Sequence, residues 1–235
     1  MLVAAAVCPC PPLLVPEVAA GAAPELDSAR AACADALGVL AAARPDLLVV
    51  VGPAEASGRG VCPEGTRGSF RGFGVDLDVR LGRDTGTGAG RELPPSLAVA
   101  AWLLEHTGWS DIPVEGLGVG ESPERCAAAG RDLAARAGRV ALLVMGDASA
   151  RRTLKAPGYL DERAEPFDAG VARALGEADT PALLALDVET AHELKASGRA
   201  PWQVLAGAAE GAGLSGTLLY DDAPYGVGYL VAAWS

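Results

Sequence analysis

Apolar and polar residues recur along this 235-residue chain with the spacings of strands and helices. Leu2–Val7 and Asp46–Gly52 are short apolar runs, the first of them stopped by a proline-rich loop, and each is typical of a strand buried on both faces. From Pro24 to Arg44 the larger apolar residues fall three and four positions apart, which predicts an amphipathic helix. A strand, a helix and a second strand in this order predict a parallel unit with a right-handed crossover.

The remainder of the chain extends this alternation of strands and helices. Further strands are predicted at 113–119, 139–145, 216–222 and 225–234, and further helices at 95–107 and 122–138, around Val171, and as shorter pieces within 180–213. Residues 75–81 alternate between apolar and polar, so we expect a strand with one wet face at an edge of the sheet. The pattern predicts an α/β fold, a single domain over residues 1–235 with a central, mostly parallel or mixed sheet and helices on both faces.

The charge and the hydrophobicity of the chain exclude two classes of partner, nucleic acids and membranes. Thirty acidic residues against 19 Lys and Arg give a net charge of −11 without a basic cluster, so we expect no nucleic acid partner. No apolar run approaches the roughly 18 residues that span a bilayer, and no basic segment precedes the first apolar stretch. We therefore expect a cytoplasmic protein without a membrane partner. The five cysteines form an odd, sparse set, which favours reduced thiols.

Candidate chemistry lies in the loops that follow the predicted strands. Ligands of open α/β sheets bind at the carboxyl ends of the strands, which directs attention to four loops. They are Cys8-Pro9-Cys10-Pro11-Pro12, Pro53-Ala54-Glu55, Gly146-Asp147-Ala148-Ser149-Ala150, and the segment from Tyr220 to Tyr229.

These loops resemble the motifs of the class III extradiol ring-cleavage dioxygenase family, in its B-type form, which includes the Memo-like proteins. CPCPPLLVPEV is similar to the family's PHPPLLVPEV-type start, and DLLVVVGPA to its second strand, which normally ends in Pro-His. MGDASARR resembles the family's Gly-Asp-x-Ser-His turn, and YDDAPYGVGYLVA its terminal Glu-Ala-Pro-Phe-Gly-Val-Gly-Tyr segment. The four matches follow the family's order and cover nearly the whole chain, so together they form a specific signal.

The resemblance implies a site whose functional residues are all replaced. Active members of the family hold ferrous iron with two histidines and a glutamate, and a further histidine works as acid or base. Position by position, the two metal histidines correspond to Cys10 and Ala54, the acid/base histidine to Ala150, and the glutamate to Asp222. Alanine can neither coordinate a metal nor transfer a proton. We therefore expect no iron cofactor at these positions and no metal ligand set.

The sequence thus favours a dioxygenase-like protein that has lost iron-dependent ring cleavage. It would retain a strand-end pocket for a small molecule or a protein partner. Further candidates for the lining of that pocket are Cys8, Asp147, Ser149 and Tyr225. The terminal strands also offer a surface to a second copy of the chain, which leaves a homodimer open.

The alternative is an active enzyme with altered chemistry in the same pocket. Cys10 would act as nucleophile or soft-metal ligand, with Asp222 or Asp147 as its polar partner. A zinc site from Cys8, Cys10, Cys62 and Asp222 is conceivable, although the Cys-x-x-Cys spacing that suits zinc is absent.

Four other features are better explained by structure than by chemistry. His106 is expected to be a half-buried residue at a helix end, and His192 a surface residue, so neither replaces the lost ligands. Ser149 lacks the flanking glycines of a nucleophile elbow, which favours a turn-forming role together with Asp147. The segment 86–90 (GTGAG) is followed by Arg91 where a dinucleotide-binding fingerprint has glycine, so it is predicted to be a loop.

Overall fold

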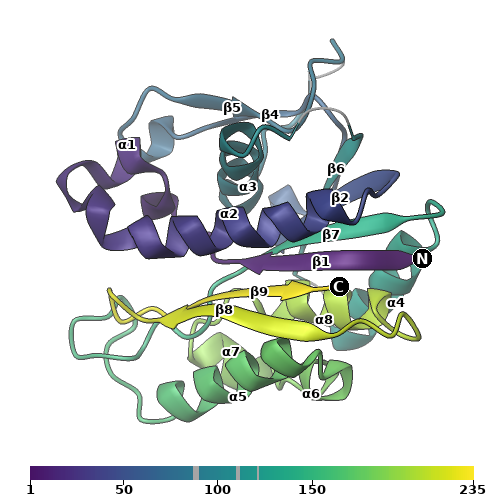
Figure 1. Ribbon diagram of the computed structural model, residues 1–235. Helices are drawn as coiled ribbons and strands as arrows, with labels where there is room; N and C mark the ends of the chain where they lie inside the picture. Colours follow the sequence, from purple (N-terminus) through teal and green to yellow (C-terminus); the bar gives the residue numbers. More distant parts are fainter. Residues whose placement is uncertain (87–89, 110–111, 121) are drawn as a thin grey trace.

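The computed structural model describes residues 1–86, 90–109, 112–120 and 122–235, and its centre is one mixed sheet of seven strands (Figure 1). The strands follow the order β3-β6-β2-β7-β1-β9-β8. Their bounds are β1 Leu2–Cys8, β2 Leu47–Pro53, β3 Gly60–Cys62, β6 Val114–Val119, β7 Val140–Met145, β8 Gly216–Asp222 and β9 Tyr229–Trp234. β6, β2, β7 and β1 are parallel, whereas β3 at one edge and β9 and β8 at the other add antiparallel pairs. The predicted α/β fold is confirmed.

Helices cover both faces of this sheet because alternate residues of each central strand point into two different cores. On one face α2 (Asp27–Ala42) and α3 (Pro95–His106) pack on the side that carries Ala4 and Ala6 of β1. On the other face α4 (Pro123–Ala134), α5 (Ala164–Glu177) and α8 (Arg199–Ala208) pack on the side that carries Ala5 and Val7. The short helices are α1 (Pro16–Ala19), α6 (Thr180–Leu184) and α7 (Val188–Glu193).

Three element predictions need correction. Of residues 75–81 only Asp78–Arg80 forms a strand, β5, which pairs with β4 (Arg67–Ser69) in a separate two-stranded sheet rather than at an edge of the main sheet. The buried side of this small sheet packs against α3, so the apolar alternation reports burial under a helix. The predicted helix at 24–44 is a 3-10 helix up to Leu26 and becomes α-helical at Asp27. The last strand begins at Tyr229, because Gly226 turns the chain with a φ of +71°.

The sheet brings four strand ends to one edge. β8 runs parallel to β1 because both strands are antiparallel to β9. The carboxyl ends of β1, β2, β7 and β8 therefore lie on the same side, together with the start of β9. In β8 the pairing with β9 shifts register between Leu218 and Tyr220, at Leu219. Among the described residues, no helix combines the length and the apolar character needed to span a membrane.

Candidate functional site

A cavity of about 750 Å³ opens at the carboxyl ends of β1 and β2. Its walls come from the loops after these two strands, the end of β6, and the segments that lead into α3 and α8. The lining residues include Cys10, Pro53, Ala54, Glu55, Ser57, Arg91, Glu92, Pro94, Ser96, Val119, Ser197, Arg199 and Ala200. The cavity therefore forms where an open α/β sheet is expected to bind ligands.

Glycines allow the walls to approach one another closely. A Cβ added at Gly118, near the end of β6, would lie 2.4 Å from the Gly58 carbonyl oxygen and 2.9 Å from the Ala54 Cβ. A Cβ added at Gly52 would lie 2.6 Å from the Ser96 hydroxyl, which donates a hydrogen bond of 2.7 Å to the Pro53 carbonyl. The Ser96 hydrogen bond ties the first turn of α3 to the end of β2 on that side of the cavity.

Cys10, Asp147 and Ser197 form a hydrogen-bonded polar corner beside the cavity. The Cys10 N–H donates to Asp147 Oδ1 at 2.8 Å, and the Asp147 N–H donates to Ser197 Oγ at 2.9 Å. Burial raises the pKa of the Asp147 carboxyl to about 6, against the opposing effect of the Cys10 N–H. The buried Tyr229 side chain, at the start of β9, has its pKa raised by burial and by nearby groups that include Asp147 and Cys10. Asp147 is therefore a candidate group for titration near neutral pH.

The Cys10 thiol lies in the wall of the cavity with 8% of the residue exposed. Burial and the Asp147 carboxylate raise its pKa well above the usual value, while the Ser197 hydroxyl opposes this shift. A thiol with a raised pKa carries little thiolate at neutral pH, and the thiolate is the form that attacks electrophiles and binds metals.

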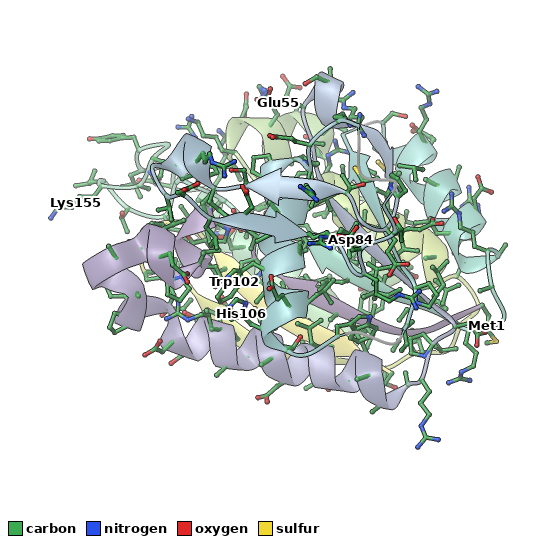
Figure 2. All side chains as sticks on the ribbon, turned by 90° about the horizontal axis from the view of Figure 1, so that it is seen from above. Met1, Glu55, Asp84, Trp102, His106 and Lys155 are labelled. Carbon is green, nitrogen blue, oxygen red and sulfur yellow. The ribbon has the colours of Figure 1, made fainter. Side chains whose placement is uncertain are left out.

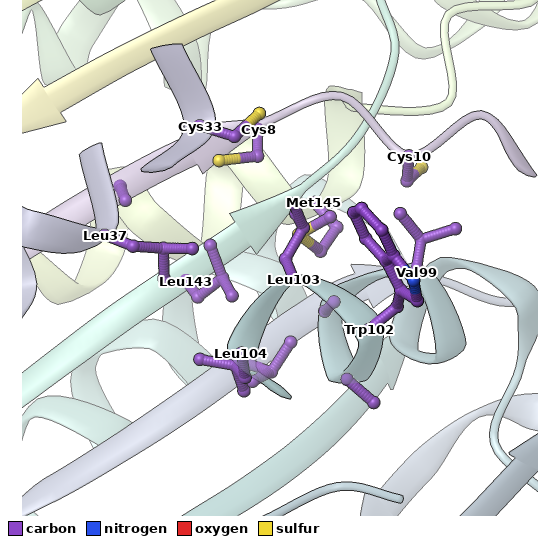
Figure 3. Packing of buried hydrophobic residues seen from close by; sticks show 14 of the residues in the cluster. Cys8, Cys10, Cys33, Leu37, Val99, Trp102, Leu103, Leu104, Leu143 and Met145 are labelled. Carbon is purple, nitrogen blue, oxygen red and sulfur yellow. The ribbon is translucent and has the colours of Figure 1, made fainter. Parts of the chain in front are cut away.

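Cys8 and Ser149 are buried in the protein and do not line the cavity. Cys8 faces Cys33 of α2 across the interface between strand and helix (Figure 3), and a hydrogen bond between the two side chains contributes most to raising the pKa of Cys8. Ser149 Oγ donates to Asp168 Oδ2 at 2.8 Å, and its N–H donates to Oδ1 at 2.8 Å. Asp168 also forms an ion pair of 3.2 Å with Arg152, so this network holds the turn after β7 against α5.

Of the four positions that the resemblance pairs with functional residues, two lie in the cavity wall. Cys10 and Ala54 line it, whereas Ala150 and Asp222 do not. The Ala150 N–H donates to the Leu194 carbonyl at 2.9 Å. Asp222 is exposed at the end of β8 and accepts the Ala223 N–H at 2.7 Å. Tyr225 lies apart from both, where it lines a separate cavity of about 580 Å³ with residues 153–155 and Pro224.

The described part of the chain brings together no group of three or more His, Cys, Asp or Glu residues that could hold a metal ion. Neither histidine contributes to the cavity. His106 is exposed, not half-buried as expected. Its ring stacks on Trp102, with the ring centroids 4.1 Å apart. Both residues lie well away from Glu55, which marks the cavity (Figure 2). His192 is exposed on α7, in agreement with the expectation from the sequence. The segment 87–89, part of the predicted glycine-rich loop, lies outside the described residues.

Comparison with known proteins adds a relationship of fold. No family model matches the chain, and no curated protein matches it. Among solved structures it is similar to the crystal structure of the uncharacterized protein JW3007 from Escherichia coli K12, with 17% identity, a TM-score of 0.53 and coverage of 99% of each chain. The two chains share a fold. At this identity the likeness extends to the fold alone.

The sequence pattern did not predict the wall formed by α8 or the buried carboxylate of Asp168. Ser197 and Arg199 belong to no recognisable motif, and they reach the cavity because α8 packs against β2 and β7. Asp168 left a signal that could have been found. It shares the apolar face of α5 with Val171 and Leu175, and an acidic residue on such a face requires a partner.

Proposed function

We propose that this chain is an extradiol-dioxygenase-like protein that has lost iron-dependent ring cleavage and binds a small organic molecule in the cavity between β1, β2, α3 and α8. The observation that carries the proposal is the placement of the family positions. The two that line the cavity are a buried thiol, Cys10, and a methyl group, Ala54, while Asp222 lies exposed outside it. This donor set does not fit ferrous iron, which prefers imidazole and carboxylate ligands around open positions.

The cavity itself supports binding of an organic ligand. Its volume falls within the roughly 300–1,000 Å³ that is usual for small-molecule sites. Prolines, alanines and Val119 supply apolar surface, and a few hydroxyl, thiol and charged groups interrupt it. A lining of this kind excludes water from an apolar ligand body while fixing its orientation through a small number of polar contacts.

The alternative, an enzyme based on Cys10, has less support. Asp147 Oδ1 accepts a hydrogen bond from the Cys10 backbone and not from its thiol, so the carboxylate is not placed as a base for that sulfur. The same carboxylate raises the pKa of the thiol. Both features oppose formation of a thiolate. A Cys10→Ala variant with the same metal content and thiol reactivity as the wild type would contradict this alternative.

Ligand-observed NMR with a library of neutral aromatic fragments tests binding in this cavity. Ala54→Leu adds bulk to the wall, and Ala150→Leu makes the same change at a family position outside the cavity. We expect fragments to bind the wild type and Ala150→Leu, and binding to fall at least tenfold in Ala54→Leu. Equal binding to all three proteins, or none to the wild type, would overturn the proposal. Stoichiometric iron with catechol-dependent oxygen uptake after loading with Fe²⁺ would overturn the loss of ring cleavage.

A further inference from the structure

We infer that a second cavity, beside the one between β1, β2, α3 and α8, binds the phosphate group of a small phosphate monoester through Arg59 and Arg91. We call it the arginine cavity. It has a volume of about 360 Å³, and its lining includes Arg59, Val61, Cys62, Pro63, Thr66 and Arg91. Of these six residues Arg91 also lines the first cavity. The inference goes beyond the proposed function, because it concerns a different ligand in a different cavity.

Arg91 is held in place by the loop between β2 and β3. Its Nη1 donates hydrogen bonds to the Ser57 and Arg59 carbonyls at 3.0 and 2.7 Å, and its Nη2 donates to Cys62 Sγ at 3.6 Å. The two carbonyls carry no net charge, so they orient the guanidinium without neutralising it. A guanidinium fixed in this way loses less conformational entropy when it binds a ligand.

Arg59 adds a second positive charge to the same cavity. Its Nε donates to the Ala54 carbonyl at 3.4 Å, which is again a neutral acceptor. A Cβ added at Gly120 would lie 2.7 Å from Arg59 Nη2 and 2.8 Å from Nε. The guanidinium therefore packs against the backbone at Gly120, where a side chain would displace it.

No carboxylate compensates these two charges within the part of the chain that the structure describes. There, neither Arg59 nor Arg91 has an Asp or Glu oxygen within 4.0 Å. Arg71, Arg83 and Arg163 show the more usual arrangement, each in an ion pair with a carboxylate. Two like charges on one cavity repel each other, and a dianion between them would convert that repulsion into attraction.

The lining of the arginine cavity defines the class of ligand. A phosphate monoester carries close to two negative charges near neutral pH and has three acceptor oxygens, which match two guanidinium groups. The cavity is larger than one phosphate group needs, and its volume lies within the roughly 300–1,000 Å³ of small-molecule sites. Val61, which is 51% exposed, and Pro63 provide apolar surface for the organic part of the molecule.

Three probes test the inference: phenyl phosphate, phenyl sulfate, which has the same shape and one charge fewer, and inorganic phosphate, which lacks the organic part. Arg59 and Arg91 are exposed, so calorimetry at pH 8 and low ionic strength limits screening of their charges. The wild type should bind phenyl phosphate at least tenfold more tightly than phenyl sulfate, and more tightly than inorganic phosphate. Arg59→Gln and Arg91→Gln should each weaken binding of phenyl phosphate at least tenfold, and Arg91→Lys should retain part of it.

Arg125→Gln is the matched control, because Arg125 is an exposed arginine of α4 that does not line the arginine cavity. It should keep the affinity of the wild type for phenyl phosphate, and a melting temperature close to that of the wild type checks that each variant is folded.

Three results would overturn the inference. They are no binding of phenyl phosphate to the wild type, equal binding of phenyl phosphate and inorganic phosphate, and a loss in Arg125→Gln that matches the loss in Arg59→Gln or Arg91→Gln. The neutral fragments that probe the first cavity keep the two proposals separate, because Arg59→Gln should leave their binding unchanged. If those fragments bind and phenyl phosphate does not, the inference is wrong and the proposed function stands.

Discussion

Asp147 connects the loop after β1 to the segment before α8, through its carboxylate on one side and its backbone N–H on the other. Its burial is unfavourable for the ionised form, which is why the pKa is raised from 3.8 to about 6. The carboxylate persists there because it accepts the Cys10 N–H, a donor that would otherwise be left unpaired in a buried loop. One residue therefore positions two walls of the cavity, and the free-energy cost of burying its ionised carboxylate depends on pH.

The pH dependence of stability tests this description of Asp147. Because the folded state binds the proton more tightly than the unfolded state, the contribution of Asp147 to stability falls as the pH rises from about 4 to about 6. In Asp147→Asn this dependence is absent. The free energy of unfolding of the variant, relative to the wild type, should rise by roughly 2–3 kcal/mol between pH 4 and pH 7. Urea denaturation at several pH values measures it, and a difference that stays constant with pH would contradict the shift.

Removal of the Ser149 hydroxyl tests the buried network with Asp168. Ser149→Ala removes one hydrogen-bond donor from the Asp168 carboxylate, a residue that is 1% exposed. We therefore expect the free energy of unfolding to fall by about 1–3 kcal/mol. Ser57→Ala, at an exposed position of the cavity wall, should change stability by less than about 0.5 kcal/mol. Chemical denaturation of both variants provides the comparison. A loss no larger than that of Ser57→Ala would rule out a stabilising role for the network.

At the scale of elements, the close approach of β6 to the loop after β2 depends on the absence of a side chain at Gly118. Gly118→Ala should lower the free energy of unfolding by about 1–3 kcal/mol, because the new Cβ meets backbone at 2.4 Å. The substitution should also weaken fragment binding, because the new Cβ would press on Ala54, which lines the cavity. Gly72→Ala is the control, because a Cβ there meets nothing within 4 Å. Thermal melts that fail to separate the two variants would show that the wall can adjust.

Most elements were predictable because the residues that they bury form recognisable apolar patterns in the sequence. The apolar runs of β1, β2 and β7 are buried on both faces, and their prediction required no knowledge of a partner strand. For β5 the alternation identified a strand with one buried face but not the surface that buries it. The side of the cavity contributed by Ser197 and Arg199 was not predictable, because their proximity to Cys10 arises from tertiary packing between residues far apart in the chain.

For the whole molecule, the relative positions of the strand ends decide whether an iron site could be built at these loops. Introducing Cys10→His, Ala54→His and Asp222→Glu together would supply the two histidines and the glutamate of the dioxygenase family that these loops resemble. Because residue 222 lies outside the cavity that holds positions 10 and 54, we expect less than about 0.1 equivalent of iron after anaerobic loading with Fe²⁺ and desalting. Elemental analysis measures this. One equivalent of iron in the triple variant would mean that the end of β8 reaches the cavity in solution.

The register shift in the middle of β8 has a consequence for how the protein behaves when it is crowded. A strand from a neighbouring molecule could extend the sheet only by matching the hydrogen-bonding repeat of its outermost strand. That repeat is interrupted at Leu219, a residue 38% exposed, and the strand ends in two carboxylates, Asp221 and Asp222. Sheet extension from molecule to molecule is therefore disfavoured by the backbone and by charge repulsion at the same edge. We therefore expect the β8 edge to be a poor template for fibrous aggregation at high protein concentration.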